Sequence, residues 1–421
     1  MAVLNFITDN ILRNPPILLA LIAMLGLIIQ RKSAADVIKG TLTAAFGMII
    51  LQAGVGMLVG AIVPINAAVQ AGLGAGVADG VNDVTFTAAH GGDIGLAMLF
   101  GLVIHLLIAR FTPVKTIFLT GHMLWWFPFI FIAAGAEAGL SGGLLIIFGA
   151  ILSACYWSFM PWIMRKYVWA ATEDDSFLIG HPTGILSLVS GAVASKFGDR
   201  SRSTEDLNIP SGLGFFREIS ITGGIVLFLM TLIVGLVTGT LVPEGGNLFM
   251  AALDAGITFG AGLLIMLYGV RLLINQIIPA FQGIAERVVP GAKPAFDVPI
   301  LFNYRPNAVI LGFVIAMITS TILIIIANAT NMFGILLVPL VITSFFEIGG
   351  AAVIGDGVGG LRGAVIGTIV ASVLMVALLG LSVLLFQNTI MNWLMVFGGN
   401  DLSLFGIIGR GIGSLLGGFG G

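Results

Sequence analysis

The chain has 421 residues, of which 58% are hydrophobic and only 9% charged, and its formal net charge is −2. Roughly a quarter of the residues of an ordinary soluble domain are charged, so this composition excludes a water-soluble globular protein. The mean hydropathy of +1.11 indicates that most of the surface faces lipid. The small net charge, without a basic tract, gives no sign of nucleic-acid binding. The single cysteine, Cys155, lies in an apolar run, which argues against a disulfide, a metal cage or thiol catalysis.

Apolar runs long enough to cross a bilayer recur along the whole chain. A hydrocarbon core about 30 Å thick needs ~20 apolar residues in a helix. Such runs occupy about 15–30, 41–63, 94–111, 116–135, 143–163, 219–241, 255–279, 306–328, 332–353 and 363–386. A weaker eleventh candidate lies within 389–419, where glycine is frequent. The sequence therefore predicts an all-α polytopic membrane protein with about 10–11 transmembrane helices.

Basic residues follow the odd-numbered spans, whereas the segments 64–76 and 135–142 after even-numbered spans contain no Lys or Arg. Lys and Arg are enriched in loops that stay in the cytoplasm. We therefore expect the odd-numbered spans to end inside and the N-terminus to lie outside, with Arg13 as the exception. A bacterial inner membrane, crossed many times, is the expected location.

Two similar strings indicate an internal repeat. AGVGMLVGAIVP at 53–64 and YGVRLLINQIIP at 268–279 share a Gly-Val start and a Pro end at an offset of 215 residues (268 minus 53). Short apolar strings also match by chance. By the charge pattern, however, the second span begins inside and the seventh outside, which makes the halves an inverted repeat, a plan common in transporters. We expect one integral-membrane transporter unit over 1–421, with repeats at about 41–163 and 255–386 and a cytoplasmic connecting segment at about 164–218.

The segments after the two prolines, 64–95 and 279–304, are too polar to span and too apolar to be ordinary loops. At the offset of 215, Asn82 corresponds to Asp297. Transporter sites form near the midplane on helices broken by Gly and Pro. The sequence therefore predicts two re-entrant hairpins, with Asn82 and Asp83 in the first and Asp297 in the second.

Three ionisable residues are the main candidates for a site, because such groups inside a membrane are costly and mostly functional. His122 follows Thr-Gly and precedes Trp125 and Trp126, although it could instead be an interfacial histidine. Asp297 lies among three prolines and is suited to accept hydrogen bonds from sugar hydroxyls, but it could instead pair with Lys293 or Arg305. His181, in an apolar Ile-Gly-His-Pro-Thr loop, could equally be an ordinary loop histidine.

Other polar residues give weaker signals. His105 lies in the middle of the third span, where a hydrogen bond between helices is expected. No group of histidines, cysteines or carboxylates has metal-ligand spacing, so no metal and no cofactor are expected. The absence of a Walker motif disfavours an ATP-driven pump.

Several strings together resemble one family, the ascorbate-type IIC permeases of the bacterial phosphotransferase system (PTS), in the ascorbate/galactitol superfamily. They run in family order: RFTPVKTIFLTGH at 110–122, IGH at 179–181, STEDLNIPSGL at 203–213, IIPAFQGIAERVVPGAKPAFD at 277–297, YRPNAVILGF at 304–313 and LRGAVIG at 361–367. The family's TGH histidine falls on His122, its IGH histidine on His181, and the aspartate after PGA on Asp297.

The resemblance implies a homodimer in which a mobile core carries a sugar past a dimerising scaffold. It also implies that a separate cytoplasmic IIB protein, itself supplied by IIA, phosphorylates that sugar from a cysteine. The phosphoryl chemistry is then expected on IIB, with no catalytic residue in this chain.

Two departures bear on the substrate. Ascorbate-type members carry glutamine at the positions of Trp126 and Pro182, and discrimination rests on pairing buried polar groups. Ascorbate is therefore the leading expectation, beside a pentitol, a hexitol or another sugar acid. The expected substrate-binding residues are His122, Asp297, His181, Asn82, Asp83, Trp126 and Pro182.

Two rival functions stay open. A proton-coupled secondary transporter on the same fold would use Asp297, Glu347 or a histidine as its proton carrier. A membrane enzyme acting on lipid would need a convergent catalytic cluster, which the sequence does not reveal. A scaffold or leaky channel is disfavoured by the polar segments at membrane depth.

Overall fold

A computed structural model describes residues 10–11, 14–72, 83–207, 218–242, 246–287 and 289–417. Its main helices are α2 (Pro15–Ile29), α3 (Ala34–Gly72), α4 (Asp83–Phe111), α5 (Met123–Glu137), α6 (Gly142–Thr172), α7 (Gly184–Phe197), α8 (Ile219–Thr238), α9 (Leu248–Arg287), α11 (Pro306–Ala329), α13 (Gly349–Leu385), α14 (Met391–Phe397) and α15 (Asp401–Gly417). Short pieces join them: β1 (Thr116–Phe118), β2 (Leu178–Ile179), η2 (Thr204–Asp206), β3 (Lys293–Phe296), α10 (Pro299–Phe302), α12 (Val341–Thr343) and the π-helix η4 (Ser344–Ile348).

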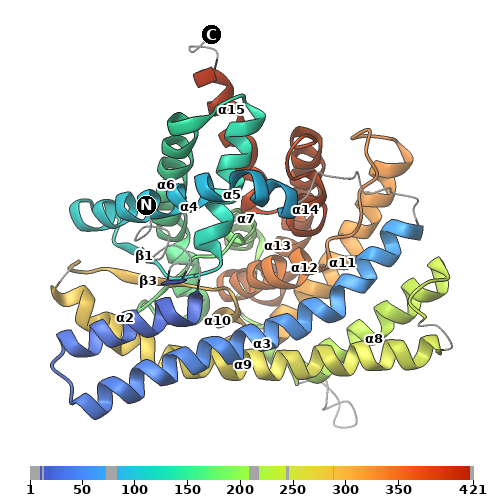
Figure 1. Ribbon diagram of the computed structural model, residues 1–421. Helices are drawn as coiled ribbons and strands as arrows, with labels where there is room; N and C mark the ends of the chain where they lie inside the picture. The colour runs from blue at the N-terminus through green and yellow to red at the C-terminus, as the bar shows by residue number, and fades with distance from the viewer. Residues whose placement is uncertain are drawn as a thin grey trace.

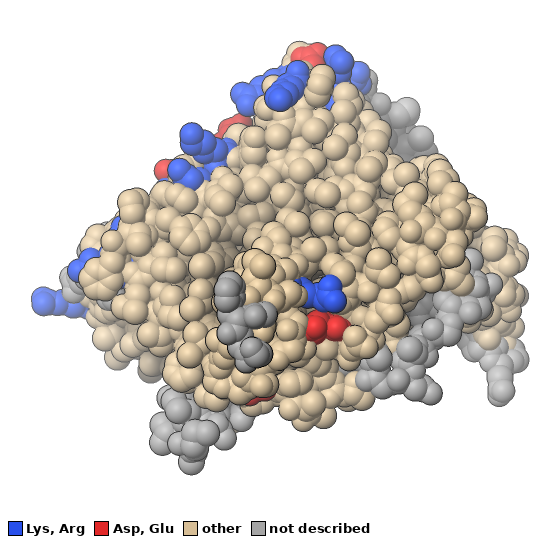
Figure 2. Space-filling model, turned by 90° about the horizontal axis from the view of Figure 1, so that it is seen from above, with Lys and Arg blue, Asp and Glu red and all other residues tan. Residues whose placement is uncertain are grey.

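The predicted all-α polytopic fold is confirmed. Among the described residues, seven helices are long and apolar enough to cross a membrane, and three shorter apolar helices accompany them. In the face drawn in Figure 2, most of the visible Lys and Arg side chains gather along one margin, and the rest is largely uncharged. Such a distribution fits a protein whose broad apolar surface is covered by lipid.

The long helices α3 and α9 run side by side in Figure 1, and glycines bring their backbones together. A Cβ atom on Gly47 would lie 3.2 Å from the carbonyl oxygen of Gly269, and one on Gly54 would lie 2.7 Å from that of Gly262. The order of these contacts makes the helices antiparallel. Gly47 and Gly262 are separated by 215 residues, as are Gly54 and Gly269, so the close contacts join positions that the inverted repeat relates. The division of the chain into two repeats stays a prediction.

The second polar segment is not a helical hairpin, and the expected re-entrant hairpin of the first segment stays a prediction. In the first, α3 continues through Pro64 to Gly72 and α4 begins at Asp83; residues 73–82, which include Asn82, lie outside the described residues. In the second, α9 continues through Pro279, and the chain then forms β3 and α10. The physical reason is that Pro294 within β3 and Pro290 and Pro299 on either side lack backbone donors, which disfavours a helix, so the segment is extended and pairs with β1 and β2 instead.

Helical reversals occur at other places. The helices α5 and α6 are joined by a short turn with positive φ at Gly139 and Gly142. The expected span 332–353 is helical only from Val341, and it belongs with the span 363–386 to one helical stretch that breaks at Gly360, where φ is +62°. A Cβ atom on Gly355 would lie 3.0 Å from the carbonyl oxygen of Gly363. Residues eight apart in a straight helix would be separated by about 12 Å, so the chain reverses sharply here.

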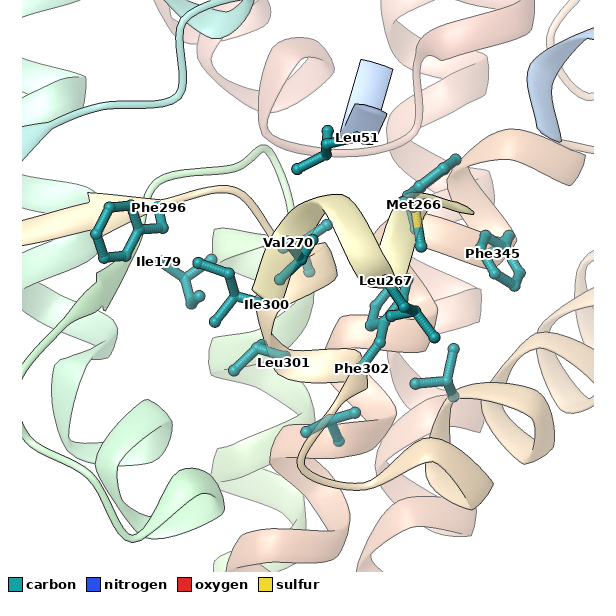
Figure 3. Packing of buried hydrophobic residues seen from close by; sticks show 14 of the residues in the cluster. Leu51, Ile179, Met266, Leu267, Val270, Phe296, Ile300, Leu301, Phe302 and Phe345 are labelled. Carbon is teal, nitrogen blue, oxygen red and sulfur yellow. The ribbon is translucent and has the colours of Figure 1, made fainter. Parts of the chain in front are cut away.

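One of two buried apolar clusters includes the region where α9 approaches β2 and β3 (Figure 3). Met266, Leu267 and Val270 of α9 belong to one buried cluster with Ile179 of β2 and Phe296 of β3. The one-turn helix α10 adds Ile300, Leu301 and Phe302, and η4 adds Phe345. The core thus holds the strand ends at a defined position beside the long helices.

Candidate functional site

A small parallel sheet positions the three main candidate residues. Its strand order is β1-β3-β2, with Phe118 opposite Ala295 and Ile179 opposite Phe296. Because the carboxyl ends of parallel strands lie at one edge, the residues that follow the strands converge there. His122 follows β1, His181 follows β2, and Asp297 follows β3 directly.

Backbone hydrogen bonds extend this pairing beyond the strands. The N–H of Leu119 donates to the carbonyl of Ala295 (2.9 Å), and that of Gly180 donates to the carbonyl of Phe296 (2.7 Å). A Cβ atom on Gly180 would lie 2.7 Å from the ring of Phe118, so a glycine is needed between β2 and His181. Packing against Phe118 therefore explains the glycine in the Ile-Gly-His string at 179–181.

His105 contributes to the placement of β1. Its Nε2 accepts a hydrogen bond from the N–H of Phe118 at 3.0 Å, and its Nδ1 lies 2.8 Å from the hydroxyl of Ser158. The expected bond between helices is confirmed, because His105 joins α4 to α6. The same side chain also fixes the strand that leads to His122.

Asp297 lies between the two histidines. Its Oδ1 is 2.6 Å from Nδ1 of His181, and its Oδ2 is 3.7 Å from Nδ1 of His122. The alternative partners are engaged elsewhere: Nζ of Lys293 is 2.9 Å from Oδ2 of Asp175, and Nη1 of Arg305 is 2.7 Å from Oδ2 of Asp356. The interpretation of Asp297 as a partner of Lys293 or Arg305 is therefore wrong.

A cavity of about 410 Å³ contains His122, Trp126, His181 and Asp297. Its opposite wall is a stripe of α3 that includes Gln52. The cavity is thus bounded by the long helix on one side and by the strand ends, α5, η4 and α14 on the other. Cavities that are mostly apolar with a few convergent polar groups are typical of small-molecule sites.

The remaining expected site residues lie differently. Asp83 lines a second cavity of about 520 Å³, which shares Gln52, His122 and Trp126 with the first. Pro182 is buried and is not among the described residues that line either cavity; its carbonyl accepts a hydrogen bond from the N–H of Asp401. Pro182 therefore contributes to the site indirectly, through the hydrogen bond that joins the loop of His181 to the start of α15.

Asp401 holds the loop that carries His181. Its carboxylate accepts hydrogen bonds from the N–H groups of Gly184 (3.0 Å) and Ile185 (2.7 Å) and from the hydroxyl of Tyr156. The two amides are orphan donors at the start of α7, which a carboxylate satisfies well. The string Gly-Gly-Asn-Asp at 398–401 contains a helix-start signal, but sequence reasoning did not connect it to the site.

Glu347 is a cavity residue that the predicted set of site residues lacks. It lies in the π-helix η4, and its Oε1 accepts a hydrogen bond from Asn400 at 2.7 Å. The same oxygen is 3.8 Å from Nε2 of His181. Its Oε2 is buried and has no hydrogen-bond partner among the described residues. Single turns of π-helix are frequent at functional sites, and a buried carboxylate in an apolar span was the available sequence signal.

Aromatic rings form another part of the cavity wall. The rings of Trp126 and Trp393 have their centroids 4.8 Å apart, and Trp393 lies 5.3 Å from Phe397. All three residues line the cavity. The string Trp125-Trp126 pointed to this wall, whereas Trp393 lies in the chain's least clear span and was not predicted.

The histidines and Asp297 could in principle hold a metal ion. One ligand atom from each of His122, His181 and Asp297 lies within 4.8 Å of the others. The spacing in the sequence gave no such signal, because the sheet brings these residues together. As arranged, Asp297 makes ion-pair contacts with both rings, which gives each histidine a partner without a metal.

Two comparisons with known proteins show what the chain as a whole is similar to. Residues 10–401 match the family described as "PTS system sugar-specific permease component". The chain is 26% identical over 419 residues to a protein of Mycoplasma pneumoniae named "Ascorbate-specific PTS system EIIC component". That alignment covers 85% of this chain and 63% of the other protein, so the chain spans less than two thirds of the length of that relative.

Proposed function

Because the chain belongs to the sugar-specific permease component family of the PTS, we propose that it binds and translocates a sugar or sugar acid for phosphorylation by a separate cytoplasmic IIB protein. Ascorbate is the first substrate to test, since the Mycoplasma relative is named for it. The phosphoryl group would pass from IIA to IIB and then to the bound sugar.

The observation that carries this proposal is the convergence of His122, His181 and Asp297 in one cavity between α3 and the strand ends. Broken helices and extended backbone at membrane depth are expected only where they line a cavity. A carboxylate flanked by two imidazoles offers acceptors and donors to neighbouring sugar hydroxyls.

The two walls of the cavity suggest how translocation proceeds. One wall belongs to α3, which packs along α9 through the glycine contacts, and the other belongs to the strand ends and the reversing helices. Movement of the second group past the first would expose the sugar to one side and then the other. We assign α2, α3, α8 and α9 to the scaffold and the remaining helices to the moving core.

Phosphorylation makes the transport one-way. In the cytoplasm the phosphoryl group passes from the cysteine of IIB to a sugar hydroxyl, whose proton leaves to a base. His181 is placed to orient that hydroxyl or to take the proton. The charged product then cannot return cheaply through an apolar pathway.

The arrangement in the membrane is part of the proposal. Basic residues after odd-numbered spans support an N-terminus outside a bacterial inner membrane. Gly224, Gly256 and Gly260 bring α8 and α9 together within the chain, and the apolar groove that these two helices form is the surface that we assign to a homodimer. Asn82 and Asp83 are assigned to the path that leads to the cavity, since Asp83 lines the adjoining one.

A second candidate is a proton-coupled transporter on the same fold. Glu347 favours it, because a buried carboxylate beside a histidine could carry a proton across. That mechanism requires no phosphoryl donor and releases unmodified sugar.

Uptake into proteoliposomes separates the two functions. Labelled ascorbate and a panel of sugars, pentitols and hexitols are supplied outside, with or without phosphorylated IIB inside. Accumulation of a phosphorylated sugar only with the donor supports the permease. Accumulation of unmodified sugar that a protonophore abolishes would establish the proton-coupled transporter instead.

A further inference from the structure

A group of exposed basic residues lies where the end of α7 meets the reversal in α13. The segments 196–202 and 358–362 make up this surface, which we call the basic platform. Its exposed side chains include Lys196, Arg200, Arg202 and Arg362. Clustered positive charges on a protein surface attract negatively charged partners and speed their association.

Backbone hydrogen bonds join the two segments of the basic platform. The N–H of Asp199 donates to the carbonyl of Gly359 at 2.7 Å. The N–H of Leu361 donates to the carbonyl of Arg202, also at 2.7 Å. The platform therefore presents its side chains from a fixed backbone, and little conformational entropy of the chain is lost when a partner binds.

The acidic side chains near the basic platform are engaged within the protein. Each of the three between residues 199 and 206 accepts a hydrogen bond from a backbone N–H: Asp199 from Ser201, Glu205 from Asn307 and Asp206 from Ser203. By contrast, the side chains of Lys196 and Arg202 have no hydrogen-bond or ion-pair partner among the described residues. These two positive charges are therefore available to a partner.

An exposed aromatic side chain accompanies these charges. Phe197 is the last residue of α7, and its side chain is 55% exposed. Its neighbours Lys196 and Arg200 place it at the water boundary, because charged side chains are costly deeper in a bilayer. Aromatic residues and Arg are both enriched where proteins contact one another. The platform thus has the composition of a protein-binding surface.

The basic platform is connected directly to the cavity. The helix α7 begins at Gly184, shortly after His181, and its 14 residues lead to the platform, a length of about 20 Å. The first arm of α13 follows Glu347 of η4 and reaches the platform at Gly360. Both helices belong to the group that we assign to the moving core. In the proposed orientation, the platform faces the cytoplasm.

We infer that the basic platform is the surface on which the phosphoryl donor IIB docks, with Phe197 at the contact and Arg202 and Arg362 facing acidic groups of the donor. A phosphorylated cysteine adds negative charge to IIB, and Arg binds phosphoryl and carboxylate groups in bidentate geometry. A donor held on the core moves together with the bound sugar, whereas a donor held on the scaffold does not. The inference rests on the proposed function and names the surface through which its partner acts.

The test measures how the rate of sugar phosphorylation depends on the concentration of phosphorylated IIB. The full-length protein is used in detergent micelles, where IIB reaches both of its faces, with labelled ascorbate and the panel of sugars, pentitols and hexitols. In the double variant Arg202→Glu with Arg362→Glu, repulsion replaces attraction. We expect the half-saturating concentration of IIB to rise about tenfold or more, with the maximal rate and calorimetric sugar binding without IIB unchanged.

The aromatic contact is tested in the same assay. Phe197→Ala removes the apolar side chain and leaves every charge in place. We expect it to raise the half-saturating concentration of IIB about tenfold, the effect of losing one well-packed interface residue. This variant keeps the test decisive if the double charge reversal does not fold.

Two matched controls carry the same changes on the scaffold. Lys32→Glu with Lys39→Glu reverses two exposed charges around the start of α3. Phe46→Ala removes an aromatic side chain of α3 that is 54% exposed. Both controls should leave the half-saturating concentration of IIB unchanged.

Three results would overturn the inference. They are an equal increase in the scaffold controls, no increase in folded platform variants, and an increase that appears only when anionic lipid is added to the micelles. The last would assign the platform to lipid headgroups. Failure of the wild type to phosphorylate any sugar at any concentration of IIB would instead contradict the proposed function itself.

Discussion

Oδ1 of Asp297 lies 2.6 Å from Nδ1 of His181, and the two residues follow neighbouring parallel strands that pair Ile179 with Phe296. The contact therefore depends on strand register. His122, which follows the remaining strand β1, lies near the same carboxylate. A sheet of nine residues in an otherwise helical membrane protein thus assembles the polar centre of the cavity.

We predict that Asp401 is needed to place His181. Asp401→Ala leaves the N–H groups of Gly184 and Ile185 unpaired, and each unsatisfied buried donor costs about 1–3 kcal/mol. Sugar binding and the apparent Tm in detergent should both fall. Tyr156→Phe removes one hydrogen bond to the same carboxylate and one to the carbonyl of His181, but leaves both amides paired, and should lower Tm by a smaller amount. A larger loss for Tyr156→Phe than for Asp401→Ala would contradict this account.

We predict that the α3–α9 contact tolerates no side chain at Gly54. A Cβ atom there would lie 2.3 Å from the backbone nitrogen of Met266, and overpacking of this kind costs about 1–3 kcal/mol. Gly54→Ala should therefore lower Tm. Gly60→Ala in the same helix meets no atom within 4 Å and should leave Tm unchanged or raise it. Equal effects of the two substitutions would show that the helices do not approach as described.

A buried ion pair should couple the loop before η2 to the core. Arg305 and Asp356 are 2.7 Å apart, and Asp356 also accepts hydrogen bonds from Ser203 and Thr204. Removing one partner of a buried pair costs about 3–5 kcal/mol. In a double-mutant cycle measured by unfolding, Arg305→Met with Asp356→Leu should cost less than the sum of the single changes. The exposed pair between Lys293 and Asp175 is the control, and Asp175→Asn should change Tm little. Additive effects at Arg305 and Asp356 would refute the coupling.

Sugar binding should not require a metal ion. Asp297 lies within ion-pair distance of both His122 and His181, so their charges compensate one another directly. We expect binding measured by calorimetry to be unchanged after EDTA treatment and dialysis. Loss of binding that added Zn²⁺ restores would instead assign the cluster of three ligands to a metal.

Much of this fold follows from hydrophobicity and charge. Apolar runs give the long helices α4, α6 and α11 directly, and short polar strings single out His122, His181 and Asp297 because ionisable groups at membrane depth are rare. The offset of 215 residues predicted that the strings at 53–64 and 268–279, which lie in α3 and α9, are related. It could not show that their glycines pack together, since that depends on how two distant segments meet.

The parts that sequence reasoning missed depend on tertiary contacts. Prolines near Asp297 suggested irregular backbone, but a strand of four residues is formed only because β1 and β2 supply its partners. Glu347 enters the cavity from the π-helix η4, and Trp393 enters it from α14. A hydropathy profile does not show which distant segments meet at a cavity. In the sequence, both residues therefore resemble ordinary parts of apolar spans.

The most direct test compares uptake by the wild type, Asp297→Asn and the control Asp175→Asn in proteoliposomes that contain phosphorylated IIB. The labelled substrates are ascorbate and the sugars, pentitols and hexitols named above. We predict that the wild type and Asp175→Asn accumulate a phosphorylated sugar, whereas Asp297→Asn stays folded, with the oligomeric state of the wild type, but accumulates none. Full uptake by Asp297→Asn would remove Asp297 from the site and contradict the central claim that its carboxylate holds the sugar.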